Sequence, residues 1–218
     1  MRLHRLADIG PFFGLTSAGG GFPLLSGDAL RHRIRLVGDR LGTDDRRVAA
    51  SVAYQGIAGR LLSVALGAAV LTGEIPDLAP VQWDPAGTAP DDLRLPDPAP
   101  LPSSRIAPAV LHGLLVPLHD ATRALVPVSS QLLWGNAGSS LAGSLRVLHT
   151  WCMQQGRVED GERAVALARG LFEDPLLRDT GTFTARGFVR RTCCLYYRVP
   201  SGGGTCGDCV LRHPPRAA

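Results

Sequence analysis

DDRRVAASVAYQGIAGRLLSVALGAAVLT, residues 44 to 72, is the stretch from which the rest of the fold can be worked out. Asp44 and Asp45 supply a helix N-cap and an acidic first turn. Apolar residues follow at helical spacing and cover more than one face; they are Val48, Val52, Ile57, Leu61, Leu62, Val64, Leu66 and Val70. The pattern predicts a helix over residues 44–72 that is buried on much of its surface and bends at Gly56 or Gly59.

Helical patterning returns in three later stretches: residues 107–125, a stretch that begins at Ser129, and residues 159–174. Pro117 is expected to bend or split the first of these. In the second, five apolar residues share one face; they are Trp134, Leu141, Leu145, Leu148 and Cys152. Free cysteine behaves as a small hydrophobe, so Cys152 is predicted to be a packed core thiol.

Strand signals are weaker. HRIRLVG, residues 32–38, alternates apolar and basic residues and predicts a short half-exposed strand. TGTFTARGFV, residues 180–189, is rich in β-branched and aromatic residues and predicts a strand that leads into the cysteines. Between Pro76 and Pro108 the prolines exclude a continuous helix. We expect an extended surface connection there, and the alternative is one or two strands, around VQW and LRL, that cover a cleft.

These patterns predict an α+β fold with a predominantly helical body and a few short strands. The body is expected to span residues 1–185, with a Pro-rich connection at about 74–108, and a Cys-rich C-terminal module is expected to span residues 186–218. The 218 residues, 45% of them hydrophobic, suit one ordinary domain with a small appendix.

Charge is concentrated in the C-terminal module. All 23 basic residues are arginine, and the net charge of the chain is +4. The module carries six arginines against one acid, Asp208, which gives it +5. The N-terminal residues contain no apolar stretch of signal-peptide length. The apolar run at residues 61–73 suits a buried helix better than a membrane span. We therefore expect a cytoplasmic protein without a membrane span, although peripheral association with a membrane is compatible with the sequence.

Four of the five cysteines lie in the module as a CC(x11)CxxC pattern: Cys193, Cys194, Cys206 and Cys209. Disulfides are disfavoured because cytosolic thiols are kept reduced. CGDC is a good half-site for zinc, but adjacent cysteines on an extended backbone diverge and make one tetrahedral centre harder to close. An iron–sulfur cluster accepts wider ligand spacings. Spacing alone leaves zinc and iron–sulfur open.

The run RRTCCLYYRVPSGGGTCGDCVL resembles the C-terminal signature of the FhuF-like ferric siderophore reductases, C-C-x10-C-x2-C, whose cysteines bind a [2Fe-2S] cluster. LLWGNAGSSLAGSLR, residues 132–146, is similar to the WGN-centred helix of that family, and a helix with a central Arg before a Pro-rich stretch adds support. This chain has eleven residues between Cys194 and Cys206 where the family pattern has ten. A Gly-rich loop absorbs one residue easily, so all four cysteines are retained as predicted ligands.

The resemblance implies one-electron reduction of ferric iron held by a siderophore, which releases ferrous iron. An external electron donor is then required, either a ferredoxin-like protein or a reductase that uses a reduced nucleotide, because no nucleotide or flavin motif is present. Arg190, Arg191 and Arg198 are predicted to favour electron uptake by the cluster or to contact an acidic donor or an anionic chelate. Tyr197 is a further predicted contact. No catalytic residue beyond the cluster is expected.

Other interpretations use the same residues differently. A zinc-stabilised binding module would use the arginines to contact an anionic partner such as nucleic acid, although we expect no nucleic acid partner. A [2Fe-2S] redox sensor or electron carrier would keep the cluster without the reductase activity. Asn136 is interpreted as a buried hydrogen-bonding residue, and His112, His119 and His149 lack the spacing of metal ligands.

Overall fold

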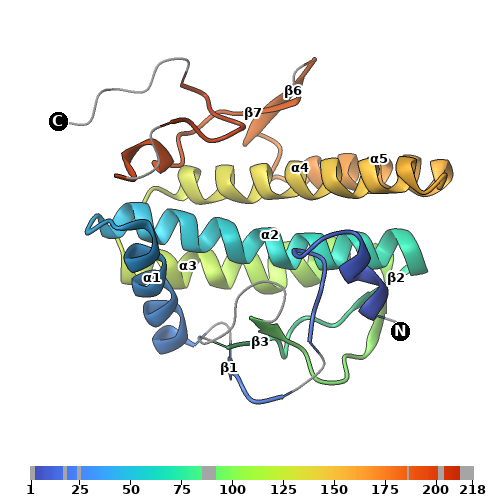
Figure 1. Ribbon diagram of the computed structural model, residues 1–218, viewed down its shortest axis with the longest axis horizontal. Coiled ribbons are helices and arrows are strands. Elements are labelled where there is room, and N and C mark those ends of the chain that lie inside the picture. Colours follow the sequence, from blue (N-terminus) through green and yellow to red (C-terminus); the bar gives the residue numbers. More distant parts are fainter. Residues whose placement is uncertain are drawn as a thin grey trace.

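Helix α2, Arg46–Thr72, runs through the middle of the molecule, and the other long helices pack around it (Figure 1). The computed structural model describes residues 3–16, 19–23, 26–84, 92–185, 187–200 and 204–211. Asp45 caps the helix by accepting a hydrogen bond of 2.9 Å from the backbone N–H of Arg47. The predicted helix is therefore confirmed, and its acidic start has the predicted capping role.

α2 also meets the length and composition of a membrane-spanning helix. However, 78% of its most apolar 18-residue window is buried inside the structure, which is typical of the central helix of a packed core. Close packing reaches its glycines as well. A Cβ added to Gly67 would lie 2.8 Å from the ring of Phe13, so the segment before α1 can approach only because a glycine stands there.

Residues 32–38 are helical, and the predicted strand is wrong. They lie within α1, Gly27–Leu41, which begins where Ser26 Oγ accepts a hydrogen bond of 3.3 Å from the backbone N–H of Ala29. Three buried residues at helical spacing form its inner face: Leu30, Ile34 and Val37. The alternation of apolar and basic residues at positions 33–36 is too short to distinguish the two-residue repeat of a strand from the 3.6-residue repeat of a helix.

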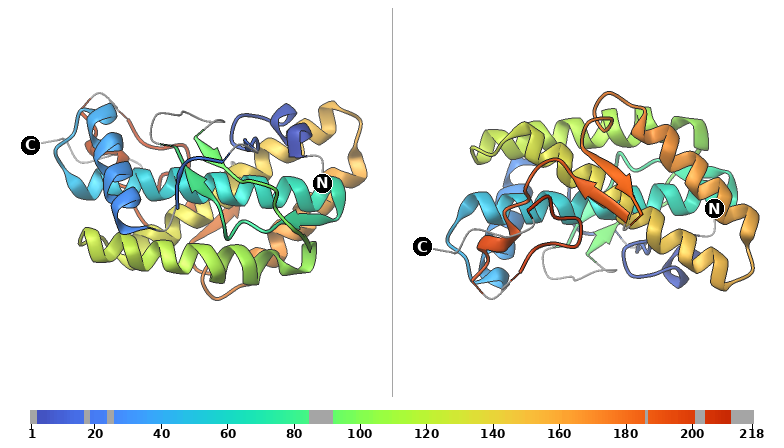
Figure 2. Two further views of the ribbon diagram at one scale, coloured as in Figure 1. Left: turned by 90° about the horizontal axis from the view of Figure 1, so that it is seen from below. Right: turned by 90° about the horizontal axis from the view of Figure 1, so that it is seen from above.

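The helices after the Pro-rich stretch agree with the sequence. A π-helical stretch, Ala107–Leu115, passes directly into α3, Val116–Leu125, so the hydrogen-bonding pattern changes one residue before Pro117. α4, Ser130–Gln154, and α5, Val158–Phe172, then form an antiparallel pair beside α2 (Figure 2).

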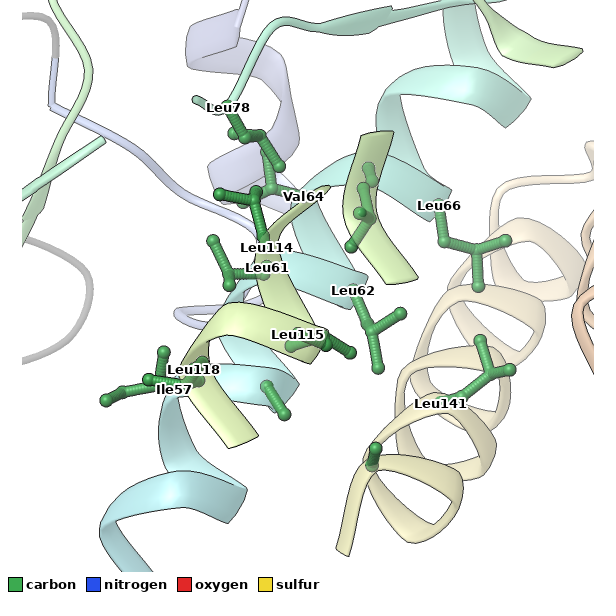
Figure 3. Packing of buried hydrophobic residues seen from close by; sticks show 14 of the residues in the cluster. Ile57, Leu61, Leu62, Val64, Leu66, Leu78, Leu114, Leu115, Leu118 and Leu141 are labelled. Carbon is green, nitrogen blue, oxygen red and sulfur yellow. The ribbon is translucent and has the colours of Figure 1, made fainter. Parts of the chain in front are cut away.

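The core lies where α2 meets its neighbours. In Figure 3, leucines from the π-helical stretch and α3 face α2 on one side, and Leu141 of α4 faces α2 on the other. Cys152 is fully buried in the same cluster, which confirms its prediction as a packed thiol, and burial raises the pKa of its side chain.

Two small antiparallel sheets form around the Pro-rich stretch. One has the order β1-β3-β4, from Phe22–Pro23, Gln82–Trp83 and Leu93–Arg94, and the other pairs β2, Glu74–Pro76, with β5, Pro100–Pro102. The expectation of a connection without strands is therefore wrong, and the alternative of strands around VQW and LRL is confirmed. Pairing of β3 with β4 buries the side chains of Trp83 and Leu93, and Leu95, directly after β4, is buried as well. Residues 85–91 of this stretch lie outside the described residues.

Candidate metal centre

The C-terminal module begins with a hairpin that lies across α4 (Figure 2). β6, Gly181–Thr184, pairs antiparallel with β7, Gly187–Arg190, and Gly181 is opposite Arg190. The predicted strand is thus a pair of strands, and the predicted boundary at 185–186 falls between them. Alternation along β7 buries Phe188 and Arg190 and leaves Val189 half-buried, so the last residue of the strand points into the protein.

The four predicted ligand cysteines occupy two short stretches. Cys193 and Cys194 follow β7 closely, and Cys206 and Cys209 flank a tight turn in which the backbone N–H of Cys209 donates to the Cys206 carbonyl at 3.1 Å. Two sulfurs accept backbone hydrogen bonds of 3.3 Å, Cys193 Sγ from Leu195 and Cys209 Sγ from Leu211. Within the described residues, no three or more His, Cys, Asp or Glu side chains lie close enough together to hold one metal ion.

The thiols nonetheless act on one another. The hydrogen bond between the Cys206 and Cys194 thiols lowers the pKa of Cys194, which also accepts a bond from the backbone N–H of Tyr196. The same hydrogen bond raises the pKa of Cys206, while burial raises the pKa of Cys193. The charge of Cys209 contributes to the shifts of both Cys193 and Cys206. The fold therefore brings all four thiols into one electrostatic neighbourhood.

Arg190 lies beside this neighbourhood and is buried, with a relative exposure of 1%. Its charge lowers the pKa of Cys194. Its Nη2 donates to the side-chain oxygen of Asn136, but its Nε and Nη1 have no hydrogen-bond partner among the described residues. No described carboxylate forms an ion pair with it. A buried cation is costly without a counter-charge, so a negatively charged group beside the cysteines would compensate it.

Asn136 connects this arginine to the core. Its Nδ2 donates to the backbone oxygen of Ser51 at 2.8 Å and to Ser51 Oγ at 3.0 Å, and Ser51 Oγ donates to the Cys194 carbonyl at 2.6 Å. All of these groups are buried. The prediction that Asn136 is a buried hydrogen-bonding residue is confirmed, and the WGN motif of α4 is joined to the first cysteine pair through α2.

The second cysteine pair is attached to the same helix through Asp208 of the CGDC turn. Ser139 Oγ donates to Asp208 Oδ2 at 2.6 Å, and the Asp208 carbonyl accepts a bond of 3.0 Å from the backbone N–H of Arg190. Neither Ser139 nor Asp208 was among the predicted site residues. Their only sequence signal is position, since one lies in the WGNAGSS motif and the other lies between two predicted ligands.

Small residues let the module approach α4 closely. A Cβ on Gly135 would overlap Thr192 Oγ1 and lie 3.3 Å from Arg190 Nη2. A Cβ on Gly138 would overlap Thr180 Oγ1 and lie 2.8 Å from the Thr180 Cβ. Gly135 therefore lets Thr192, which precedes the first cysteine pair, approach α4, and Gly138 lets Thr180, which precedes β6, do the same.

Replacing Gly138 with alanine is expected to lower the free energy of unfolding by about 1–3 kcal/mol, because the added methyl group overpacks the contact with Thr180. The matched control is Gly143→Ala on the same helix, where a Cβ meets no atom within 4 Å. That change should raise stability by up to about 1 kcal/mol, since alanine is the better helix former. Urea denaturation of both variants measures the difference, and equal stabilities would contradict the close packing described here.

The other predicted contact residues lie at the surface. Arg191 Nη1 pairs with Asp179 at 2.7 Å, and Arg198 Nη1 pairs with Asp45 at 2.8 Å. Tyr197 is half-buried in the short 3₁₀ turn Tyr196–Arg198. Arg190 differs from these residues, because its burial removes it from contact with a soluble partner and leaves only its predicted electrostatic effect.

Two of the three histidines have identified structural partners. His112 Nε2 lies 2.8 Å from Asp174 Oδ2. His119 is buried, stacks on Trp134 and hydrogen-bonds Ser130 at 2.9 Å. These contacts give both residues a structural role.

The residues present suit a four-thiolate iron–sulfur centre. An oxidised [2Fe-2S] centre with four thiolates carries a net charge of about −2, and hydrogen bonds to the sulfurs tune its potential. The N–H···S bonds to Cys193, Cys194 and Cys209 and the unpartnered nitrogens of Arg190 suit such an anionic centre. Cys193, Cys194, Cys206 and Cys209 are the residues that would hold it.

Comparison with known proteins gives a family match in the same region and one relative. Residues 190–211 match the FhuF 2Fe-2S C-terminal domain family. The chain is also 33% identical over 107 residues to the ferric siderophore reductase of Escherichia coli (strain K12), an alignment that covers 45% of this chain and 37% of the length of that relative. No solved structure gives a significant match. The family match covers the four cysteines and agrees with the resemblance that they carry, and the relative has the same family character.

Proposed function

We propose that this protein reduces ferric iron in siderophore complexes by transferring one electron from a [2Fe-2S] cluster held by Cys193, Cys194, Cys206 and Cys209. The observation that carries the proposal is the buried Arg190, which has two nitrogens without a hydrogen-bond partner among the described residues and lowers the pKa of Cys194, in a segment that matches a 2Fe-2S domain. The relative named ferric siderophore reductase supports the choice of acceptor. The reduction is proposed to take place in the cytoplasm.

When bound, the cluster supplies a carrier that accepts and donates single electrons. The chain's own residues set the conditions for that transfer. Arg190 provides a fixed positive charge that favours the reduced state, since adding an electron makes the site more negative. Ser51 and Asn136 hold the backbone at Cys194, and Ser139 holds the turn at Asp208, so the ligands are fixed relative to α4.

Siderophores bind ferric iron far more tightly than ferrous iron, so one electron is enough to release the metal without breaking the chelator. No proton or covalent intermediate is needed at the protein. The electron must come from an external donor, a ferredoxin-like protein or a nucleotide-dependent reductase.

Iron, zinc and acid-labile sulfide analysis of the aerobically purified protein tests the proposal. We expect about two irons and two sulfides per chain, as for any [2Fe-2S] protein. Dithionite-reduced protein should then be oxidised by a ferric siderophore within a stopped-flow experiment, with one ferrous ion formed per chain. A colourless protein with one zinc and no sulfide would refute the cluster. A brown protein that ferric siderophores oxidise no faster than a generic acceptor does would refute the reductase activity.

A further inference from the structure

A cavity of about 780 Å³ lies directly beside the predicted metal centre. Its walls come from five parts of the chain: residues 10–13, the face of α2 from Val52 to Ser63, the face of α4 from Ser139 to Val147, Tyr196, and the turn at residues 205–208. This volume falls within the range of protein sites that enclose a small molecule, about 300–1,000 Å³.

The cavity touches the metal centre at one ligand. Among the described residues that line it, Cys206 is the single cysteine, and its neighbours Gly207 and Asp208 complete that wall. Cys193, Cys194 and Cys209 are not among the lining residues. A molecule in the cavity would therefore meet the centre on the Cys206 side.

The cavity wall is mainly apolar. Phe12 and Val147 line it and are 45% and 42% exposed, so large apolar surface is left open there. The serine hydroxyls are already engaged: Ser140 Oγ donates to the Gln55 carbonyl at 3.1 Å, and Ser63 and Ser144 share a bond of 2.8 Å. The wall offers a ligand apolar contact more than new hydrogen bonds.

The charge of the wall bears on which partner fits. Arg146 and Asp208 are the charged residues among those that line the cavity, and their nearest charged atoms are 4.0 Å apart. Their charges offset one another, so the wall lacks the cationic patch that an acidic electron-donor protein would need. A concave wall without net charge suits a small, compact chelate with apolar groups on its surface.

We infer that this cavity is the docking site of the ferric chelate and that Cys206 is the ligand on the side from which the electron leaves. The inference rests on the proposed function. One electron passes from the reduced centre to the chelated ferric ion, which becomes ferrous, and an external one-electron donor restores the reduced state. The donor protein then docks elsewhere on the surface.

Two glycines in the cavity wall allow the cavity to be filled by a single substitution. A Cβ on Gly143 of α4 meets no atom within 4 Å, so Gly143→Phe places a ring in the cavity without a clash at its first atom. Gly170 of α5 is also helical, exposed and free of atoms within 4 Å, and it does not line the cavity. Gly170→Phe is therefore the matched control. Gly56→Leu fills the cavity from α2 and serves as a second variant if Gly143→Phe folds poorly.

The binding probe is the gallium(III) complex of a neutral trihydroxamate chelator, because gallium matches ferric iron in charge and size but is not reduced. Isothermal titration of the full-length protein should show binding that weakens at least tenfold in Gly143→Phe and stays unchanged in Gly170→Phe. Oxidation of the reduced protein by a ferric chelate should slow at least tenfold in Gly143→Phe, while oxidation by ferricyanide, which needs no pocket, stays within twofold.

The outcomes separate the two ideas. If Gly143→Phe and Gly56→Leu bind the gallium complex as the unchanged protein does, the docking site is wrong even though the reductase stands. If the unchanged protein carries its cluster but its reduced form transfers no electron to ferric chelates, the proposed function itself is wrong.

Discussion

Replacing Cys206 with alanine is expected to remove at least nine tenths of the iron and acid-labile sulfide and to abolish ferric siderophore reduction. The physical reason is that a [2Fe-2S] centre needs four protein ligands, and alanine at position 206 leaves three thiolates. The loss is measured by metal and sulfide content and by the visible thiolate-to-iron absorption.

The control for this prediction is Cys152→Ala. Cys152 lies on α4 and is fully buried in the hydrophobic core, so replacing it with alanine should lower the free energy of unfolding by about 1 kcal/mol through lost packing alone. That variant should keep its cluster and its colour. If Cys206→Ala retained a full cluster, or if Cys152→Ala lost it, the assignment of the four ligands would be wrong.

Replacing Arg190 with glutamine is expected to lower the reduction potential of the cluster by roughly 90 mV. A unit charge ~8 Å from the centre at an effective dielectric constant of about 20 contributes ~2 kcal/mol. For a one-electron couple each factor of ten, 1.4 kcal/mol, is about 59 mV. The sign follows from charge: removing a fixed cation makes an added electron less favourable, so the potential becomes more negative. Spectroelectrochemical titration measures the shift.

Arg191→Gln is the matched control for this second prediction. Arg191 is the next residue, but its side chain is 53% exposed and pairs with Asp179, so solvent screens its charge. The reduction potential of the cluster in Arg191→Gln should shift by less than about a third of the shift in Arg190→Gln. Equal shifts in the two variants would mean that net charge matters and that the burial of Arg190 does not.

The sequence was most informative where a long pattern has one physical explanation. The apolar residues of α2 repeat over 27 residues, and Asp45 supplies a recognisable cap, so the central helix could be predicted from end to end. α1 could not, because the alternation at Arg33 and Arg35 is short, and the decisive signals were Ser26 as a cap and the spacing of Leu30, Ile34 and Val37.

In the site, the cysteine spacing and the family resemblance predict the ligands, but the surroundings of these cysteines depend on tertiary contacts. The basic sequence around Arg190 gives the same prediction for Arg190, Arg191 and Arg198. A signal of its burial was nevertheless present, since a period of 2 along β7 places Arg190 on the same face as Phe188. The bond between Ser139 and Asp208 joins residues 69 positions apart, and no local pattern predicts it.

The attachment of both cysteine pairs to α4 bears on how such proteins diverge. The first pair is fixed by Arg190, Asn136 and Ser51, and the second is fixed by Asp208 and Ser139. Because each pair has its own attachment, the segment that joins them does not have to set their spacing. Changes of length between residues 199 and 205 should therefore leave the ligands in place, whereas Leu195 and Tyr196 are constrained because their backbone N–H groups donate to cysteine sulfurs.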